Sequence, residues 1–204
     1  MALSTYSDIK VALLAWSERT DLSETLLEDF IRLAESDASQ QLRVPAMESA
    51  TKLVVTSGRI TIPFDFLELR RLTWEGGQDQ VLQYLPWDQF VEVNRGHPCT
   101  QPLYYSRQGP IWYISGEPGD GSEVLCHYYN YIPELNSTTQ VTNWLLDMSP
   151  TVYLFGGLKY VYEYLMDVDR AAYWGGRFDK ELNKLQAIAD LAEHRGSSLS
   201  VKTI

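Results

Sequence analysis

The chain has 204 residues, a formal net charge of −10 and an isoelectric point near 4.7. That length suits one sizeable domain or two small ones, with enough mass to bury a core. The acidic composition argues against a conventional nucleic-acid-binding surface, which needs clustered lysine and arginine. An acidic surface would instead repel a phosphate backbone, which matters only where DNA must pass a protein without sticking to it.

The first 45 residues predict two helices. Apolar residues at helical spacing indicate a short amphipathic helix that ends near Ser17, namely Tyr6, Ile9, Leu13 and Trp16. Asp21 or Ser23 can cap a second helix, and Pro45 stops it from continuing. Its predicted apolar face carries Leu26, Phe30, Leu33, Ala34, Ala38 and Leu42. The carboxylates on or near the other side are interpreted as a solvated acidic face, and they are Glu24, Glu28, Asp29, Glu35 and Asp37.

The middle of the chain predicts a compact β unit. One pair of strands is expected around the turn at 57–58 and a second pair around the turn at 76–77. One or two helical turns then follow within 86–96, where Asp88 is placed as a cap. Three more strands lead up to residue 133 and are separated by glycine-containing turns.

Helices return near the C-terminus. Ser149 suits an N-cap and Pro150 a first helical position. This helix carries two neighbouring stripes, one of Leu154, Leu158, Val161 and Leu165, the other of Tyr153, Gly157, Tyr160 and Tyr164. A last helix, with Gly196 as its C-cap, has an apolar face of Phe178, Leu182, Leu185, Ala189 and Ala192.

These elements predict an α+β fold, in which a bundle of N- and C-terminal helices carries an inserted antiparallel β domain. The expected domains are the bundle, the β domain and a short C-terminal tail, at residues 1–52 with 134–196, 53–133 and 197–204 respectively.

The aromatic stretch 149–176 is not a membrane span. Such a span needs about 20 apolar residues, and this stretch is interrupted by Lys159, Glu163, Asp167 and Asp169. Gly156 and Gly157 each cost about 1 kcal/mol of helix propensity relative to alanine, which the close approach of a neighbouring helix would offset. The tyrosine stripe can then face either the β unit or another subunit.

The sequence predicts no catalytic, cofactor or metal site. His97, His127 and His194 lie far apart, without the spacing of a zinc site. Cys99 and Cys126 form neither a disulfide framework nor a zinc quartet. Nucleotide-binding glycine loops and nucleophile elbows are also missing from the sequence.

The order of the segments resembles the head-to-tail adaptor family of tailed bacteriophages, which includes podophage tail tubular A proteins and tail accessory factors. The similarity spans roughly residues 6–190. The matching residues are Asp29, Phe30, Ile31, Leu33 to Glu35, Leu42 and Arg43, then Pro63, Asp65 to Glu68 and Arg70, then Tyr131 to Pro133 and Leu135, then Tyr153 to Leu158 and Asp167. Gly157 stands where an alanine often follows the first glycine, which is a mild departure from the pattern.

The resemblance implies a structural virion protein of the phage neck, made in the bacterial cytoplasm. Its implied partners are further copies of itself in a ring of about twelve, the portal protein, a tail or nozzle protein, and DNA that passes through the channel without specific binding. No cofactor, metal or membrane is implied. The alternatives are another neck or stopper ring protein, or a small hydrolase that uses the tyrosine-rich stretch as a pocket wall.

Two sets of residues are candidates for contacts. The resemblance implies portal docking by the last helix and the tail, with candidate residues Lys184, Ile188, Leu191, Leu199, Val201 and Ile204. A frayed, unbound terminus is the alternative for the tail. The candidates for a subunit or bundle interface are Tyr153, Gly156, Gly157, Tyr160 and Tyr164.

Overall fold

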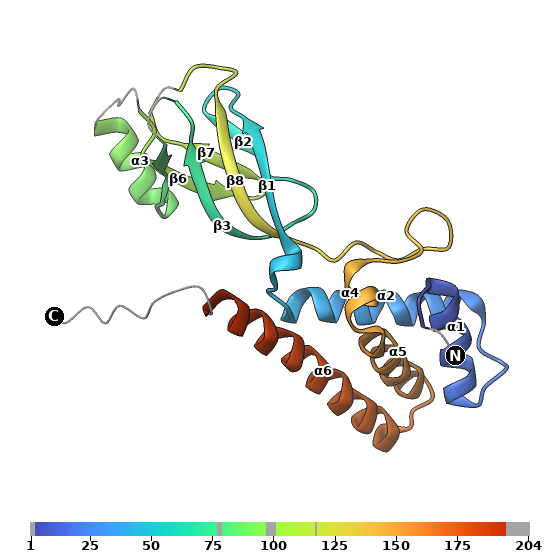
Figure 1. Ribbon diagram of the computed structural model, residues 1–204. Helices are drawn as coiled ribbons and strands as arrows, with labels where there is room; N and C mark the ends of the chain where they lie inside the picture. The colour runs from blue at the N-terminus through green and yellow to red at the C-terminus, as the bar shows by residue number, and fades with distance from the viewer. Residues whose placement is uncertain (1–2, 77–78, 97–100, 117, 195–204) are drawn as a thin grey trace, which may run out of the picture. The chain divides into compact units, whose positions relative to one another are not determined.

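The computed structural model describes residues 3–76, 79–96, 101–116 and 118–194. The chain divides into two compact units, which Figure 1 shows as a group of helices and a group of strands. The helical unit comprises Met1–Ala46 and Ile132–Ile204, and the β unit comprises Met47–Tyr131. The predicted α+β fold, with helices from both ends of the chain packed together and strands inserted between them in sequence, is confirmed.

The helical unit contains α1 (Tyr6–Ser17), α2 (Glu24–Gln41), α4 (Trp144–Met148), α5 (Pro150–Tyr164) and α6 (Val168–His194). Thr5 and Asp8 form a capping box at the start of α1, and the Ser23 hydroxyl accepts from the backbone N–H of Leu26 at the start of α2. Ser149 precedes α5 as expected, but its side chain makes no capping hydrogen bond to the helix.

Helix α5 lies at the centre of the helical unit, where it contacts α1, α2, α4 and α6 (Figure 1). Every residue from Val152 to Leu158 is buried. Neighbours on several sides explain why this helix is apolar over more than one face. By contrast, Trp16 and Leu33, which the sequence placed on apolar faces, are 49% and 46% exposed. The predicted apolar face of α6 is buried from Phe178 to Ala189, whereas Ala192 is exposed.

The β unit contains two four-stranded sheets around one core. The first sheet has the order β1-β8-β3-β4 and the second the order β2-β7-β6-β5. The bounds are β1 Glu48–Val54, β2 Arg59–Thr61, β3 Phe66–Trp74, β4 Gln80–Val81, β5 Gln83–Tyr84, β6 Tyr104–Gln108, β7 Ile111–Ile114 and β8 Glu123–Asn130, with the 3-10 helix η1 at Pro45–Met47 and helix α3 at Trp87–Gly96. Trp112, Ile60, Leu72 and Val124 are among the buried residues that the two sheets share as a core.

The β unit differs from the prediction in four details. Strand β1 starts at Glu48 rather than near residue 52. Its own sequence is largely polar, and pairing with β8 keeps these residues in the sheet. The run after Gly77 splits into β4 and β5, which join different sheets. The pair β5–β6 is parallel, whereas the other described pairs are antiparallel. Helix α3 is also longer than the expected one or two turns, and Asp88 lies inside its first turn rather than before it.

Candidate interaction surfaces

Three features of the described residues bear on metal binding, membrane insertion and thiol chemistry. No group of three or more His, Cys, Asp or Glu side chains within them is placed to hold a metal ion. None of the helices in the described ranges is long and apolar enough to cross a membrane. Cys126 is buried as a free thiol, and burial raises its pKa to about 12, which keeps it protonated and unreactive. Cys99 and His97 lie outside the described residues.

A buried polar network occupies the centre of the helical unit. Glu35 Oε1 accepts hydrogen bonds from the Tyr153 hydroxyl at 2.9 Å and from the backbone N–H of Leu135 at 2.9 Å. Asn143 Nδ2 lies 2.7 Å from the Tyr153 oxygen, and its Oδ1 accepts from the N–H of Leu146 to cap α4. The network therefore joins α2 and α5 to the segment that returns from the β unit.

The solvated position predicted for Glu35 is wrong. Glu35 is 4% exposed, and burial raises its pKa to about 7. Two other carboxylates of the predicted acidic face, those of Glu24 and Glu28, form ion pairs with Lys10. The error arises because residues about 100 positions later in the chain cover α2, which no helical period can indicate.

The glycine pair 156–157 lies where three helices meet α5. A Cβ atom on Gly156 would stand 2.7 Å from the Cβ of Ala34 on α2 and 2.8 Å from Phe178 on α6. One on Gly157 would stand 2.7 Å from Leu13 on α1. Close packing inside the chain thus favours glycine most strongly at 156, where Ala34 and the ring of Phe178 leave no room, whereas at 157 the end of the Leu13 side chain would have to shift. The structure places these two candidate interface residues, with Tyr153, in the interior of the helical unit.

The other two candidate interface residues lie nearer the surface. The Tyr160 hydroxyl donates to Asp37 Oδ2 at 2.6 Å, and Lys159 Nζ donates to the same oxygen at 2.9 Å. Burial and the Asp37 carboxylate raise the pKa of Tyr160 to about 12. Tyr164 is 55% exposed and packs its ring against Phe30.

The far end of α6 presents apolar side chains to solvent. Ile188 and Leu191 are 51% and 59% exposed, and Lys184 is exposed beside them. Ile188 also borders an apolar hollow of about 200 Å³, which is lined by Val44, Pro45, Ala46, Trp144, Met148, Leu185, Ile188, Ala189 and Ala192. The indole nitrogen of Trp144 is buried without a hydrogen-bond partner. The candidates Leu199, Val201 and Ile204, and the predicted C-cap Gly196, lie outside the described residues.

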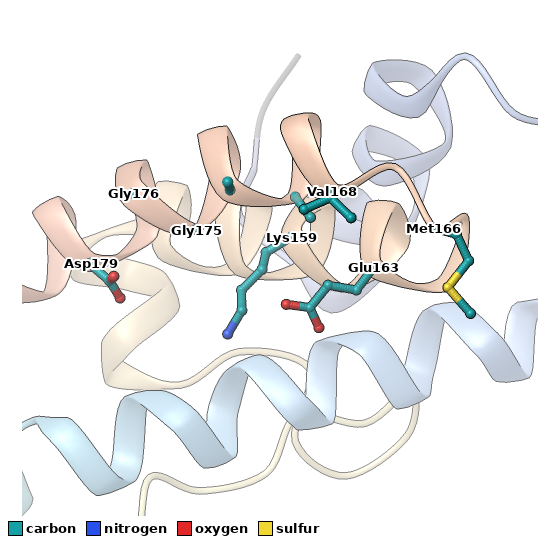
Figure 2. Close-up of a pocket in the computed structure, with 9 residues that line it drawn as sticks. Lys159, Glu163, Met166, Val168, Gly175, Gly176 and Asp179 are labelled. Atoms are coloured by element: carbon teal, nitrogen blue, oxygen red, sulfur yellow. The ribbon is translucent and has the colours of Figure 1, made fainter.

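A second hollow, of about 470 Å³, lies between α5 and α6 (Figure 2). Its lining is mostly small or apolar, with three charged residues, and consists of Lys159, Glu163, Met166, Val168, Ala171, Ala172, Gly175, Gly176 and Asp179. Figure 2 shows the Glu163 and Lys159 side chains extending from α5 on the same side. The lining of the hollow carries one positive and two negative side chains, and the positive one, Lys159, is bound by Asp37 and also lies in the field of Glu163. The sequence analysis missed this feature, and its signal was the second glycine pair, Gly175 and Gly176.

Exposed apolar side chains that lie close together, such as Ile188 and Leu191 on α6, are typical of surfaces that meet other macromolecules. The family model of the SU10 adaptor proteins matches residues 4–201. The chain therefore belongs to the SU10 adaptor protein family, and it is a phage head-to-tail adaptor, a structural phage protein. The predicted family is thereby confirmed. Membership implies binding to other phage neck proteins. No curated protein sequence matches the chain.

Proposed function

We propose that the chain forms a ring of about twelve copies beneath the portal, extends the DNA channel there and gives the tail a place to attach. The observation that carries the proposal is the family match over residues 4–201, which covers nearly the whole chain. The protein would act in the neck of the virion by assembly alone, without a chemical step. Its partners would be its own copies, the portal and a tail or nozzle protein.

The C-terminal end of α6 supports the portal contact. A helix of 27 residues is about 40 Å long, so it can hold its last turns well away from its first. Ile188 and Leu191 are exposed at that end, and the apolar hollow beside Ile188 offers a place for a partner's side chains. Apolar groups left in water gain free energy when a partner covers them.

The charge of the chain supports passage of DNA without binding. A net charge of −10 on each copy would give a ring a strongly negative field. Phosphate groups would be repelled from such a wall instead of releasing counterions onto it. DNA would therefore slide through the channel without being held.

Co-sedimentation with the purified portal ring of the same phage tests the proposal. The full-length chain should sediment with the portal at about twelve copies per ring. If the tail is needed for the contact, a version that ends at Arg195 should not sediment with the portal. Binding of both versions would keep the adaptor role and remove the tail from the contact. Binding of neither would overturn the proposal and favour a stopper or another neck position.

A further inference from the structure

A patch of aromatic rings and one arginine lies along the first half of α6, next to α1 and α5. The Arg177 guanidinium lies 4.8 Å from the centre of the Phe155 ring and donates a hydrogen bond of 3.0 Å to the Tyr173 hydroxyl. Trp174 stacks on Phe155 and meets Trp16 of α1 edge to face at 5.8 Å. Tyr173 is 57% exposed and Trp16 49%. We call Trp16, Tyr173, Trp174 and Arg177 the aromatic patch.

The composition of the aromatic patch is that of a binding surface. Tryptophan, tyrosine and arginine are the residues that contribute most to the free energy of protein association. The ring stacking and the hydrogen bond to Arg177 hold the side chains in place before any partner arrives, which lowers the entropy lost on binding.

The second hollow offers a matching surface on the same helix, and we call it the acidic hollow. Its exposed apolar groups include Met166 and Val168, which are 86% and 77% exposed. Glu163 and Asp179 supply the negative charge that an arginine needs. A Cβ atom on Gly176 would meet nothing within 4 Å, so the packing of its own chain does not require this glycine. A side chain arriving from another molecule would make use of the space.

The aromatic patch and the acidic hollow face different ways. Arg177 and Asp179 are two residues apart on α6, as are Tyr173 and Gly175. Because successive residues of an α-helix turn by about 100°, each pair points in directions about 160° apart. Two complementary surfaces on opposite sides of one subunit are what a head-to-tail contact needs, and such contacts close into rings when the rotation allows.

We propose that the aromatic patch of one copy seats in the acidic hollow of the next, with Arg177 facing Glu163 and Asp179 of its neighbour. The occupant is a second copy because the charges of the two surfaces are complementary and the surfaces point in nearly opposite directions on one subunit. The proposal rests on the ring-forming function above and names the side chains of its lateral contact. It uses the first half of α6 and leaves the end at Ile188 and Leu191 open to the portal.

Charge reversal on each surface tests the proposal. Full-length protein is examined by sedimentation velocity over a range of concentrations, alone and on the portal ring. Arg177→Glu and Asp179→Arg should each weaken self-association at least tenfold, whereas an equal mixture should recover it, because the reversed charges then face one another. Arg32→Glu, which changes an exposed arginine on α2, is the matched control and should associate like the unchanged chain.

A steric block makes the head-to-tail geometry visible. Gly176→Trp should fold, since its Cβ lies in open space, but should fill the acidic hollow and abolish self-association. Mixed with Arg177→Glu, it should give only a dimer. The intact patch of Gly176→Trp can enter the intact hollow of Arg177→Glu, and the two remaining surfaces are both disabled. A contact that used the same patch on both copies would instead let one of the two variants dimerise by itself, and the mixture would form no mixed dimer.

The outcomes separate this contact from the proposed function. Unchanged self-association of Arg177→Glu, or a wild-type chain that associates neither alone nor on the portal, overturns the contact. If Arg177→Glu forms a ring on the portal just as the wild-type chain does, the contact is overturned and the adaptor function stands. Self-association through Arg177 without any portal binding keeps the contact and overturns the portal role.

Discussion

The Tyr153 hydroxyl on α5 donates a hydrogen bond of 2.9 Å to Glu35 Oε1 on α2, in a region where both side chains are at most 4% exposed. Burial, and to a smaller extent the Glu35 carboxylate, raises the pKa of Tyr153. Burial likewise raises the pKa of Glu35 to about 7, although the Leu135 N–H and the Tyr153 hydroxyl both favour its charged form. The carboxyl thus changes its charge near neutral pH, inside the unit that carries α6.

The first prediction concerns the dependence of stability on pH. The folded state holds the Glu35 proton up to pH of about 7, whereas the unfolded chain releases it near 4.5. Between these values the folded state binds more protons, so the free energy of unfolding falls as pH rises, by up to about 3 kcal/mol. Glu35→Gln should remove this slope in urea titrations at pH 5, 6, 7 and 8.

Glu35→Ala is the companion variant. It leaves the Leu135 N–H and the Tyr153 hydroxyl without their acceptor, and it should lower the free energy of unfolding by about 2 kcal/mol at pH 5. Because it also has no carboxyl to titrate, this cost relative to the unchanged chain should shrink as pH rises. Charges near Glu35 include Glu134, which raises its pKa, and Arg32, which lowers it. A slope that persists in Glu35→Gln would assign the titration to another group.

The second prediction separates the two glycine pairs. Gly156→Ala should lower the free energy of unfolding by about 1–2 kcal/mol, because Ala34 and Phe178 leave no room for a Cβ and the overpacking outweighs the gain in helix propensity. Gly176→Ala should instead raise it by about 0.5–1 kcal/mol, since its Cβ meets nothing. Chemical denaturation measures both, and equal effects would contradict the packing described for α5.

The third prediction concerns the portal contact. Ile188→Asp and Leu191→Asp replace side chains that are more than half exposed, so the free energy of unfolding should change by no more than about 0.5 kcal/mol. Binding to the portal ring should weaken at least tenfold, because a charge would enter an apolar contact. Val11→Asp, at a residue 54% exposed on α1, is the matched control and should bind normally. Normal binding by both α6 variants would move the portal contact elsewhere.

The fourth prediction concerns the independence of the two units. Trp112 is 1% exposed and meets Phe66 edge to face at 5.2 Å, so Trp112→Ala should destabilise the β unit by about 3–5 kcal/mol. Hydrogen exchange should then accelerate in residues 47–131, while the amides of α5 keep their protection. Equal acceleration in α5 would mean that the chain unfolds as one cooperative unit.

Local signals account for the elements that the sequence predicted correctly. Ser23 caps α2, Pro150 opens α5, and the turns around Gly58 and Gly109 separate strands, because caps and turns depend on a few consecutive residues. The order of these segments also sufficed for the family, which the match over residues 4–201 confirms. Strand β1 was shortened in the prediction because its pattern is polar and its stability comes from β8.

The sequence by itself determined the α+β class and the alternation of helices, strands and helices, since both follow from spacing along the chain, and its resemblance to known adaptors indicated the family. Only the tertiary structure decided that Glu35 is buried, that neighbours leave no room for a Cβ at Gly156 but leave space at Gly176, and that Arg177 lies against Phe155 while Asp179 lines a hollow. Burial is the reason for the difference. A helical period tells which residues share a face, but the residues that cover Glu35 on that face come from segments 100 or more positions away along the chain.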